Sequence, residues 1–184
     1  MKHSSTWPAA AMLALACVAA SSTFALAANT DPDSVVAPAA TQWRMTPGVT
    51  FVPRSSDMSV TYVGAGCVTA PVGTDLAHKV VLGDGMTARF VRLYYRHDPS
   101  VRLLFALTRY DAQGALTDYG MTYSTSAAGY TSILSPELAH VVDAANYGYV
   151  VNVQFWNNPD AIFANGFENP QPPLFCGVRL MWDE

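Results

Sequence analysis

From about residue 58 to the end of the chain, apolar and polar residues alternate with a period of two, which predicts β-strands rather than helices. In the run 87–95, for example, Val91, Leu93 and Tyr95 fall on one face and Arg92 falls on the other. The pattern gives eight to ten short strands, among them residues 58–63, 67–70, 77–82, 87–95, 101–110, 116–124, 130–134, 147–156 and 175–182.

Turn residues separate these runs. A glycine-rich turn at residues 83–85 joins the runs 77–82 and 87–95, and we expect these two runs to form a β-hairpin. Residues 111–114 reverse the next strand, and only residues 136–145 could form a helical turn. Many short strands joined by such turns predict an all-β fold, and we expect an antiparallel β-sandwich with jelly-roll-like topology.

The first 27 residues follow a different pattern, which is typical of a cleavable signal peptide. Lys2 precedes an apolar run over residues 8–20, and residues 25–27 supply the Ala-x-Ala pattern of a cleavage site. The run is shorter than the roughly 20 apolar residues that span a bilayer. We therefore expect a secreted, periplasmic or cell-surface protein of a Gram-negative bacterium. A lipoprotein signal at Cys17 is the alternative, with alanine in place of the usual leucine at position 14.

The rest of the chain divides into a leader and one domain. Residues 28–48 combine proline, alanine and short polar residues without a period, which indicates a flexible leader before a β-sandwich domain over residues 49–184. Four prolines make residues 157–173 a loop insertion at the surface of this domain. No second hydrophobic stretch of membrane length follows, so we expect no membrane span after signal cleavage.

Charge and cysteine content indicate which classes of partner and which cellular compartment to expect. The 184 residues include 10 Lys and Arg and 14 Asp and Glu, and loss of Lys2 with the signal leaves a net charge of −5. This balance argues against nucleic acid as a partner, because phosphate binding needs clustered positive charge. Cys67 and Cys176 remain after cleavage, and an even count in an oxidising compartment favours a disulfide over two separate buried thiols.

No residue pattern identifies a reaction. Hydrolase elbows, zinc motifs and nucleotide-binding loops are all missing from the sequence, and we expect no metal and no cofactor. Nearly every acidic residue is assigned to a turn, namely Asp84, Asp98, Asp111, Asp118, Asp143 and Asp160.

Aromatic side chains on strands are the candidates for ligand binding. Exposed rings can stack on sugar faces, which makes Tyr94, Tyr123, Tyr147 and Trp156 candidate ligand-binding residues. The alternative is that the tyrosines only cover the edge of the core.

Several short runs stand out along the chain, namely residues 51–57, 64–67, 91–95, 142–149 and 176–180. Together they resemble a recurrent β-sandwich module of exported bacterial proteins, which has no established activity, and the resemblance covers about residues 50–182. It implies a β-sandwich with Cys67 and Cys176 bridged, and nothing about a ligand. Residues 160–168 also resemble a short motif found near the ends of secreted Gram-negative proteins, although a strand follows them here.

These observations favour a secreted, non-catalytic β-sandwich that binds a glycan or an envelope or extracellular protein. Whether the protein is an enzyme stays open at this point. The alternative function is a polysaccharide-active hydrolase whose carboxylate pair is brought together only by folding. A third hypothesis is a purely structural domain in which the insertion serves attachment or processing.

Overall fold

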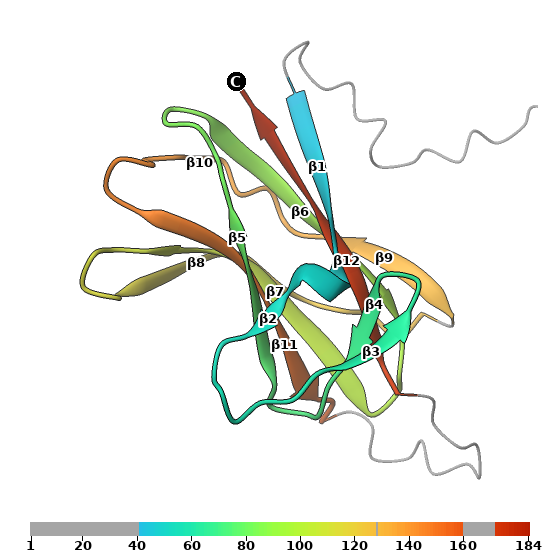
Figure 1. The fold of residues 1–184 in the computed structure, drawn as a ribbon. Helices are drawn as coiled ribbons and strands as arrows, with labels where there is room; N and C mark the ends of the chain where they lie inside the picture. The colour runs from blue at the N-terminus through green and yellow to red at the C-terminus, as the bar shows by residue number, and fades with distance from the viewer. Residues whose placement is uncertain (1–40, 128, 160–171) are drawn as a thin grey trace, which may run out of the picture. The chain divides into compact units, whose positions relative to one another are not determined.

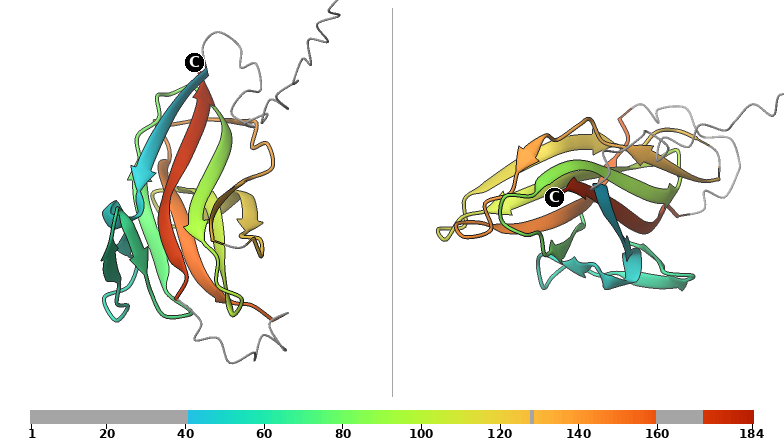
Figure 2. Two further views of the ribbon diagram at one scale, coloured as in Figure 1. Left: turned by 90° about the vertical axis from the view of Figure 1, so that its right-hand side faces the viewer. Right: turned by 90° about the horizontal axis from the view of Figure 1, so that it is seen from above.

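The alternating runs form strands in the computed structural model, which describes residues 41–127, 129–159 and 172–184. These residues hold two antiparallel sheets packed face to face (Figures 1 and 2). A seven-stranded sheet contains β1 (Thr41–Pro47), β3 (Thr61–Gly64), β4 (Cys67–Thr69), β6 (Thr87–Arg96), β9 (Tyr130–Leu134), β10 (His140–Val141) and β12 (Leu174–Asp183). A five-stranded sheet contains β2 (Val52–Pro53), β5 (Asp75–Val80), β7 (Val101–Tyr110), β8 (Leu116–Tyr123) and β11 (Gly148–Asn157).

The order of the strands is that of a jelly-roll-like sandwich. The five-stranded sheet runs β2-β5-β11-β7-β8, and the larger sheet runs β10-β6-β12-β4-β3, with β9 also beside β6 and β1 also beside β12. The chain changes sheet at most connections between the described strands, and it stays in the same sheet only between β3 and β4, β7 and β8, and β9 and β10. The predicted all-β antiparallel sandwich is therefore confirmed.

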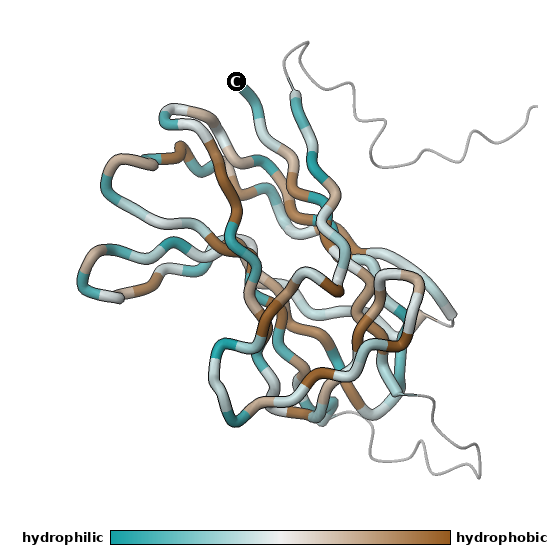
Figure 3. The backbone as a smooth tube through the Cα atoms, in the orientation of Figure 1, coloured by the Kyte–Doolittle hydropathy of each residue, from teal (hydrophilic) through white to brown (hydrophobic). Residues whose placement is uncertain are grey.

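The core lies between the inner faces of the two sheets. It includes Leu93 of β6, Phe105 of β7, Phe155 of β11 and Phe175 of β12, all at most 1% exposed. Hydrophobic residues are concentrated in the middle of the long strands (Figure 3). Because inward and outward residues alternate along a strand, this burial leaves polar residues on the outer face of each sheet.

The predicted hairpin over residues 77–95 is wrong. β5 and β6 lie in different sheets, although residues 83–85 do make a turn in which Met86 N–H donates to the Gly83 carbonyl oxygen at 3.3 Å. β5 pairs with β2 and β11, whereas β6 pairs with β12, β9 and β10. Local turn residues specify where the chain reverses direction. Which strands then pair with each other is decided by the packing of the folded domain.

Two further expectations are corrected. The leader was expected to reach residue 48, but β1 begins at Thr41 and pairs with β12 along its whole length. Residues 136–145 contain β10 and no helix, although a single turn follows in which Tyr147 N–H donates to the Asp143 carbonyl oxygen at 3.1 Å. A 3₁₀ turn, η2 (Gly48–Thr50), is the one helical element of the described part, so no helix there is long enough to cross a membrane.

The described part of the chain contains twelve strands, more than the eight to ten expected. The additional ones are β1 and the two-residue strands β2 and β10. The expected signal peptide, the leader up to residue 40 and the 160–168 motif lie outside the described residues.

The expected disulfide is present. Cys67 of β4 is bonded to Cys176 of β12, with 109 residues of separation along the chain. The bond ties an early strand to the last strand of the same sheet, and it is compatible with an extracytoplasmic location.

Candidate functional site

The four predicted ligand-binding residues do not form one site. Tyr94 lies on β6 of the seven-stranded sheet, whereas Tyr123 and Trp156 lie on β8 and β11 of the five-stranded sheet. Tyr147 packs against the core just before β11, and the Arg109 guanidinium lies 4.4 Å from its ring centre. Tyr123 and Trp156 are 43% and 44% exposed, so only these two present accessible rings on a common outer face.

The outer face of the five-stranded sheet has a hollow because its central row is built from small side chains. Ala77 of β5, Asn152 of β11 and Ala106 of β7 are direct neighbours across the three strands. The next row on this face consists of larger residues, Asp75, Gln154, Leu104 and Tyr123. We call the resulting hollow of about 110 Å³ the outer groove, and its lining residues are Arg54, Asp75, Leu104, Phe105, Ala106, Asp118, Met121, Asn152 and Gln154.

A hydrogen-bond relay fixes the polar groups at the bottom of the outer groove. Asn152 Nδ2 donates to Thr108 Oγ1 at 2.7 Å, and Thr108 Oγ1 donates to Asp118 Oδ1 at 2.5 Å. Because the single proton of the Thr108 hydroxyl goes to a carboxylate, the Asn152 amide has to present its nitrogen to that hydroxyl. The Asn152 side-chain oxygen is therefore left as an acceptor, and it is buried with no hydrogen-bond partner among the described residues.

An ion pair forms one end of the outer groove. Arg54 Nη1 donates to Asp75 Oδ2 at 2.6 Å, and the guanidinium carbon of Arg54 lies 5.7 Å from the ring centre of Tyr110. Burial raises the pKa of Asp75 above its usual 3.8, Arg54 opposes this rise, and the charge of Asp118 adds to it. Two carboxylates thus interact electrostatically within one hollow.

Asp118 and Asn152 are functional candidates that the sequence analysis did not identify. Asp118 was assigned to a turn, but it lies on β8 opposite Thr108. Asn152 and Gln154 alternate with Val151, Val153 and Phe155 along β11, so a polar pair in the middle of a core strand was the available signal.

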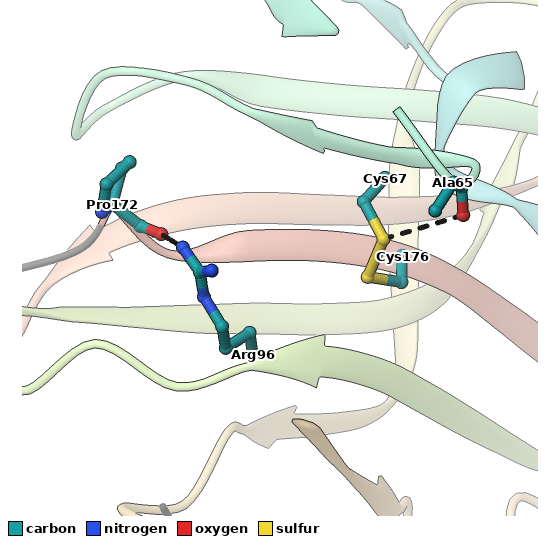
Figure 4. The surroundings of a disulfide bond; sticks show 5 residues. All are labelled: Ala65, Cys67, Arg96, Pro172 and Cys176. Carbon is teal, nitrogen blue, oxygen red and sulfur yellow. Dashed lines mark hydrogen bonds between the residues drawn. A yellow bond between two sulfur atoms is a disulfide. The ribbon is translucent and has the colours of Figure 1, made fainter. Parts of the chain in front are cut away.

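The outer face of the seven-stranded sheet has a larger and more open hollow, of about 650 Å³, beside the disulfide. Tyr94, Tyr130 and Met45 line it together with Cys67 and Cys176. Opposite Tyr130 in the pairing of β6 with β9, Arg96 Nη2 donates to the Pro172 carbonyl oxygen at 2.9 Å (Figure 4).

The aromatic rings of this sheet are already in contact with arginines. The Arg179 guanidinium lies 4.3 Å from the ring centre of Trp43 and 5.7 Å from that of Tyr94, and Arg96 lies 5.9 Å from that of Tyr130. A sugar would have to compete with these cation–π contacts. The rings near the outer groove therefore offer the better stacking surface.

Two of the three described histidines, His78 and His140, are held by side-chain contacts. His78 lies 3.1 Å from the Thr50 carbonyl oxygen, and His140 stacks on Tyr119 with ring centres 4.0 Å apart. Across the described ranges, no group of three histidine, cysteine or acidic side chains could hold a metal ion.

The environment of His140 predicts a dependence of stability on pH. Burial, and then the charge of Arg109, lowers the pKa of His140 below its usual 6.5, and burial lowers the pKa of His97 in the same direction. The unfolded chain therefore binds more protons than the folded chain in this pH range. The contribution of the two histidines to stability is fully present above pH 6.5 and is lost as the pH falls from 6.5 towards their folded-state pKa values.

We expect the urea midpoint to be lower at pH 5.5 than at pH 7.5, and the difference to shrink in a His140→Gln variant. Comparing each variant with itself at the two pH values cancels any uniform effect of the substitution. An unchanged difference in His140→Gln would contradict the assignment to His140.

The comparisons with known proteins concern the fold. No family model and no curated protein matches the chain. Among solved structures, the C-terminal CBM6 of LamC, a marine laminarinase from Zobellia galactanivorans, is 10% identical with a TM-score of 0.49, and the match covers 76% of this chain and 98% of that one. The GH26-CBM35 β-(1,4)-mannanase of Podospora anserina is 12% identical with a TM-score of 0.48, over 77% of this chain but only 28% of the mannanase.

CsCBM6-3 from Clostridium stercorarium, in complex with cellobiose, is 11% identical with a TM-score of 0.45, and the match covers 73% of this chain and 90% of that one. At such identities, and with TM-scores below 0.5, these likenesses say nothing about a ligand. The ligand has to be argued from the chain's own residues.

Proposed function

We propose that the protein is a secreted or periplasmic, non-catalytic glycan-binding domain and that the outer groove is its binding site. The observation that carries the proposal is the side-chain oxygen of Asn152, a residue that lines the outer groove: this oxygen is buried and has no partner among the described residues. Buried polar atoms are nearly always hydrogen-bonded, so such an acceptor calls for a ligand or water proton.

The chemistry of the groove matches that of a sugar. A sugar ring combines hydroxyl groups, which donate and accept hydrogen bonds, with apolar C–H faces. The groove offers acceptors on Asn152 and Asp118 and donors on Gln154 and Arg54. Trp156 lies two residues beyond Gln154 on the same face of β11, where its exposed ring could receive a C–H face.

Calorimetric titration with a panel of oligosaccharides tests this proposal. We expect Trp156→Ala and Asn152→Ala each to weaken binding by about tenfold or more, since a lost stacking contact or hydrogen bond costs about 1–2 kcal/mol. Trp43→Ala is the matched control, because Trp43 is similarly exposed but lies on the other sheet.

Equal losses in Trp43→Ala and Trp156→Ala would place binding elsewhere. If no oligosaccharide bound, the glycan proposal would fail, and an envelope or extracellular protein would be the remaining class of partner.

A second candidate function is glycoside hydrolysis, and the shared hollow of Asp75 and Asp118 is the observation that favours it. The raised pKa of Asp75 suits a general acid, and Asp118, which accepts a hydrogen bond from Thr108, is the candidate for the second carboxylate. This function predicts release of reducing ends from a polysaccharide and its loss in Asp75→Asn and in Asp118→Asn. Binding without any release would reject it.

A further inference from the structure

We propose that the outer groove selects neutral, hydroxyl-rich glycans over glycans that carry carboxylate or sulfate groups. This inference rests on the proposed function, because it specifies the ligand class of the same site. It follows from which atoms the groove residues are able to present to a ligand.

The hydrogen-bond relay makes the bottom of the groove a set of acceptors. Thr108, which is fully buried, accepts from Asn152 and donates to Asp118, so neither Asn152 nor Asp118 can reverse its role without breaking the relay. The acceptors that remain are the Asn152 side-chain oxygen, which is buried and without a partner among the described residues, and carboxylate oxygens. A hydroxyl group donates to such atoms, whereas a carboxylate or sulfate oxygen has no proton to donate.

The charges of the lining residues act in the same direction. Arg54 is already paired with Asp75 at 2.6 Å, and Asp118 forms no ion pair with any described residue. A ligand anion in the groove would therefore meet an acidic neighbour. Both the repulsion between like charges and an acceptor left without a proton would weaken binding of such a ligand.

Apart from Arg54, which is paired with Asp75, the cations of this face lie outside the lining residues of the groove. Lys79 projects from β5 beside Val150, and Arg102 lies beside Trp156 at the end of β7. Arg92, Arg96 and Arg179 belong to the opposite sheet. An anionic glycan would thus have its attractive charges at the margins or on the other sheet, and not where the relay presents acceptors.

The test uses matched ligands on the full protein. Neutral β-1,4-linked hexasaccharides of glucose and mannose are titrated beside the same oligosaccharides with their 6-hydroxyl groups oxidised to carboxylates. We expect the wild type to bind the neutral form at least about tenfold more tightly, which corresponds to about 1.4 kcal/mol. Asp118→Asn keeps the shape of the residue and removes its charge, so it should reduce this ratio by at least about threefold.

The outcomes separate the two proposals. If the carboxylated form bound as tightly as the neutral form, with both weakened by Trp156→Ala, the selectivity inference would be overturned and glycan binding would stand. If the carboxylated form bound in a way that Trp43→Ala removed and Trp156→Ala did not, that ligand would sit on the other sheet and the selectivity of the groove would be supported. Absence of binding by every probe would overturn the proposed function itself.

Discussion

Replacing both Cys67 and Cys176 with serine is expected to lower the free energy of unfolding by about 4–5 kcal/mol, because their bond closes a long loop in the unfolded chain. The two residues are 109 positions apart, and this separation sets the size of the effect in the chain-entropy model. Urea unfolding of the oxidised wild type and of the double variant measures it.

The local effect of this substitution should be concentrated in the β3–β4 hairpin. β3 pairs only with β4 among the described strands, and β4 is aligned with β12 through the single pair Val68 and Phe175. Faster amide hydrogen exchange in β3 and β4 than in β11 is therefore expected once the bond is removed. A change of less than about 1 kcal/mol in unfolding free energy would show that the unfolded chain is not restrained as the model assumes.

Phe155→Ala is expected to destabilise the protein by about 3–5 kcal/mol, the range for removing a fully buried phenylalanine. The side chain of Phe155 is 0% exposed and projects into the core from β11, which lies between β5 and β7. Its backbone also makes two hydrogen bonds. The Phe155 carbonyl oxygen accepts from Gly73 N–H at 2.7 Å, and Phe155 N–H donates to the Thr74 carbonyl oxygen at 2.9 Å. The strand should therefore keep its place and leave a cavity.

The neighbouring Trp156→Ala variant is the control for this measurement. Trp156 follows Phe155 on the same strand but projects outward, so its removal should change stability by less than about 1 kcal/mol while weakening ligand binding. If the two variants were equally destabilised, the assignment of inner and outer faces on β11 would be wrong.

The alternation of apolar and polar residues was sufficient to predict the long strands. β7, β11 and β12 appear within one or two residues of the predicted ranges, because each buries one face and the period of two records that burial. β1 gave no such signal, since Trp43 and Met45 are both exposed and the strand is held by pairing with β12. Hydrogen bonds between the backbones of two strands do not require apolar and polar side chains to alternate, so they produce no pattern in the sequence.

The candidate site was less predictable for a related reason. The aromatic candidates were chosen by residue type alone, without knowledge of their positions in the fold. Tyr94 was therefore grouped with Trp156, although the two lie on different sheets. The outer groove depends on Asn152 and Ala106 being neighbours, which is a matter of register between strands distant in sequence. Register is fixed by the folded sandwich as a whole.

The pairing of the first and last described strands has a consequence for how the chain acquires its structure. β1 runs beside β12 with Thr41 opposite Asp183, so the larger sheet needs residues from both ends of the domain. A chain that emerges progressively from its N-terminus leaves one edge of β1, β4 and β6 without a neighbour until β12 arrives. Non-local pairing of this kind slows folding. We therefore expect the larger sheet to form only when synthesis of the domain is nearly complete, later than the pairing of β7 with β8.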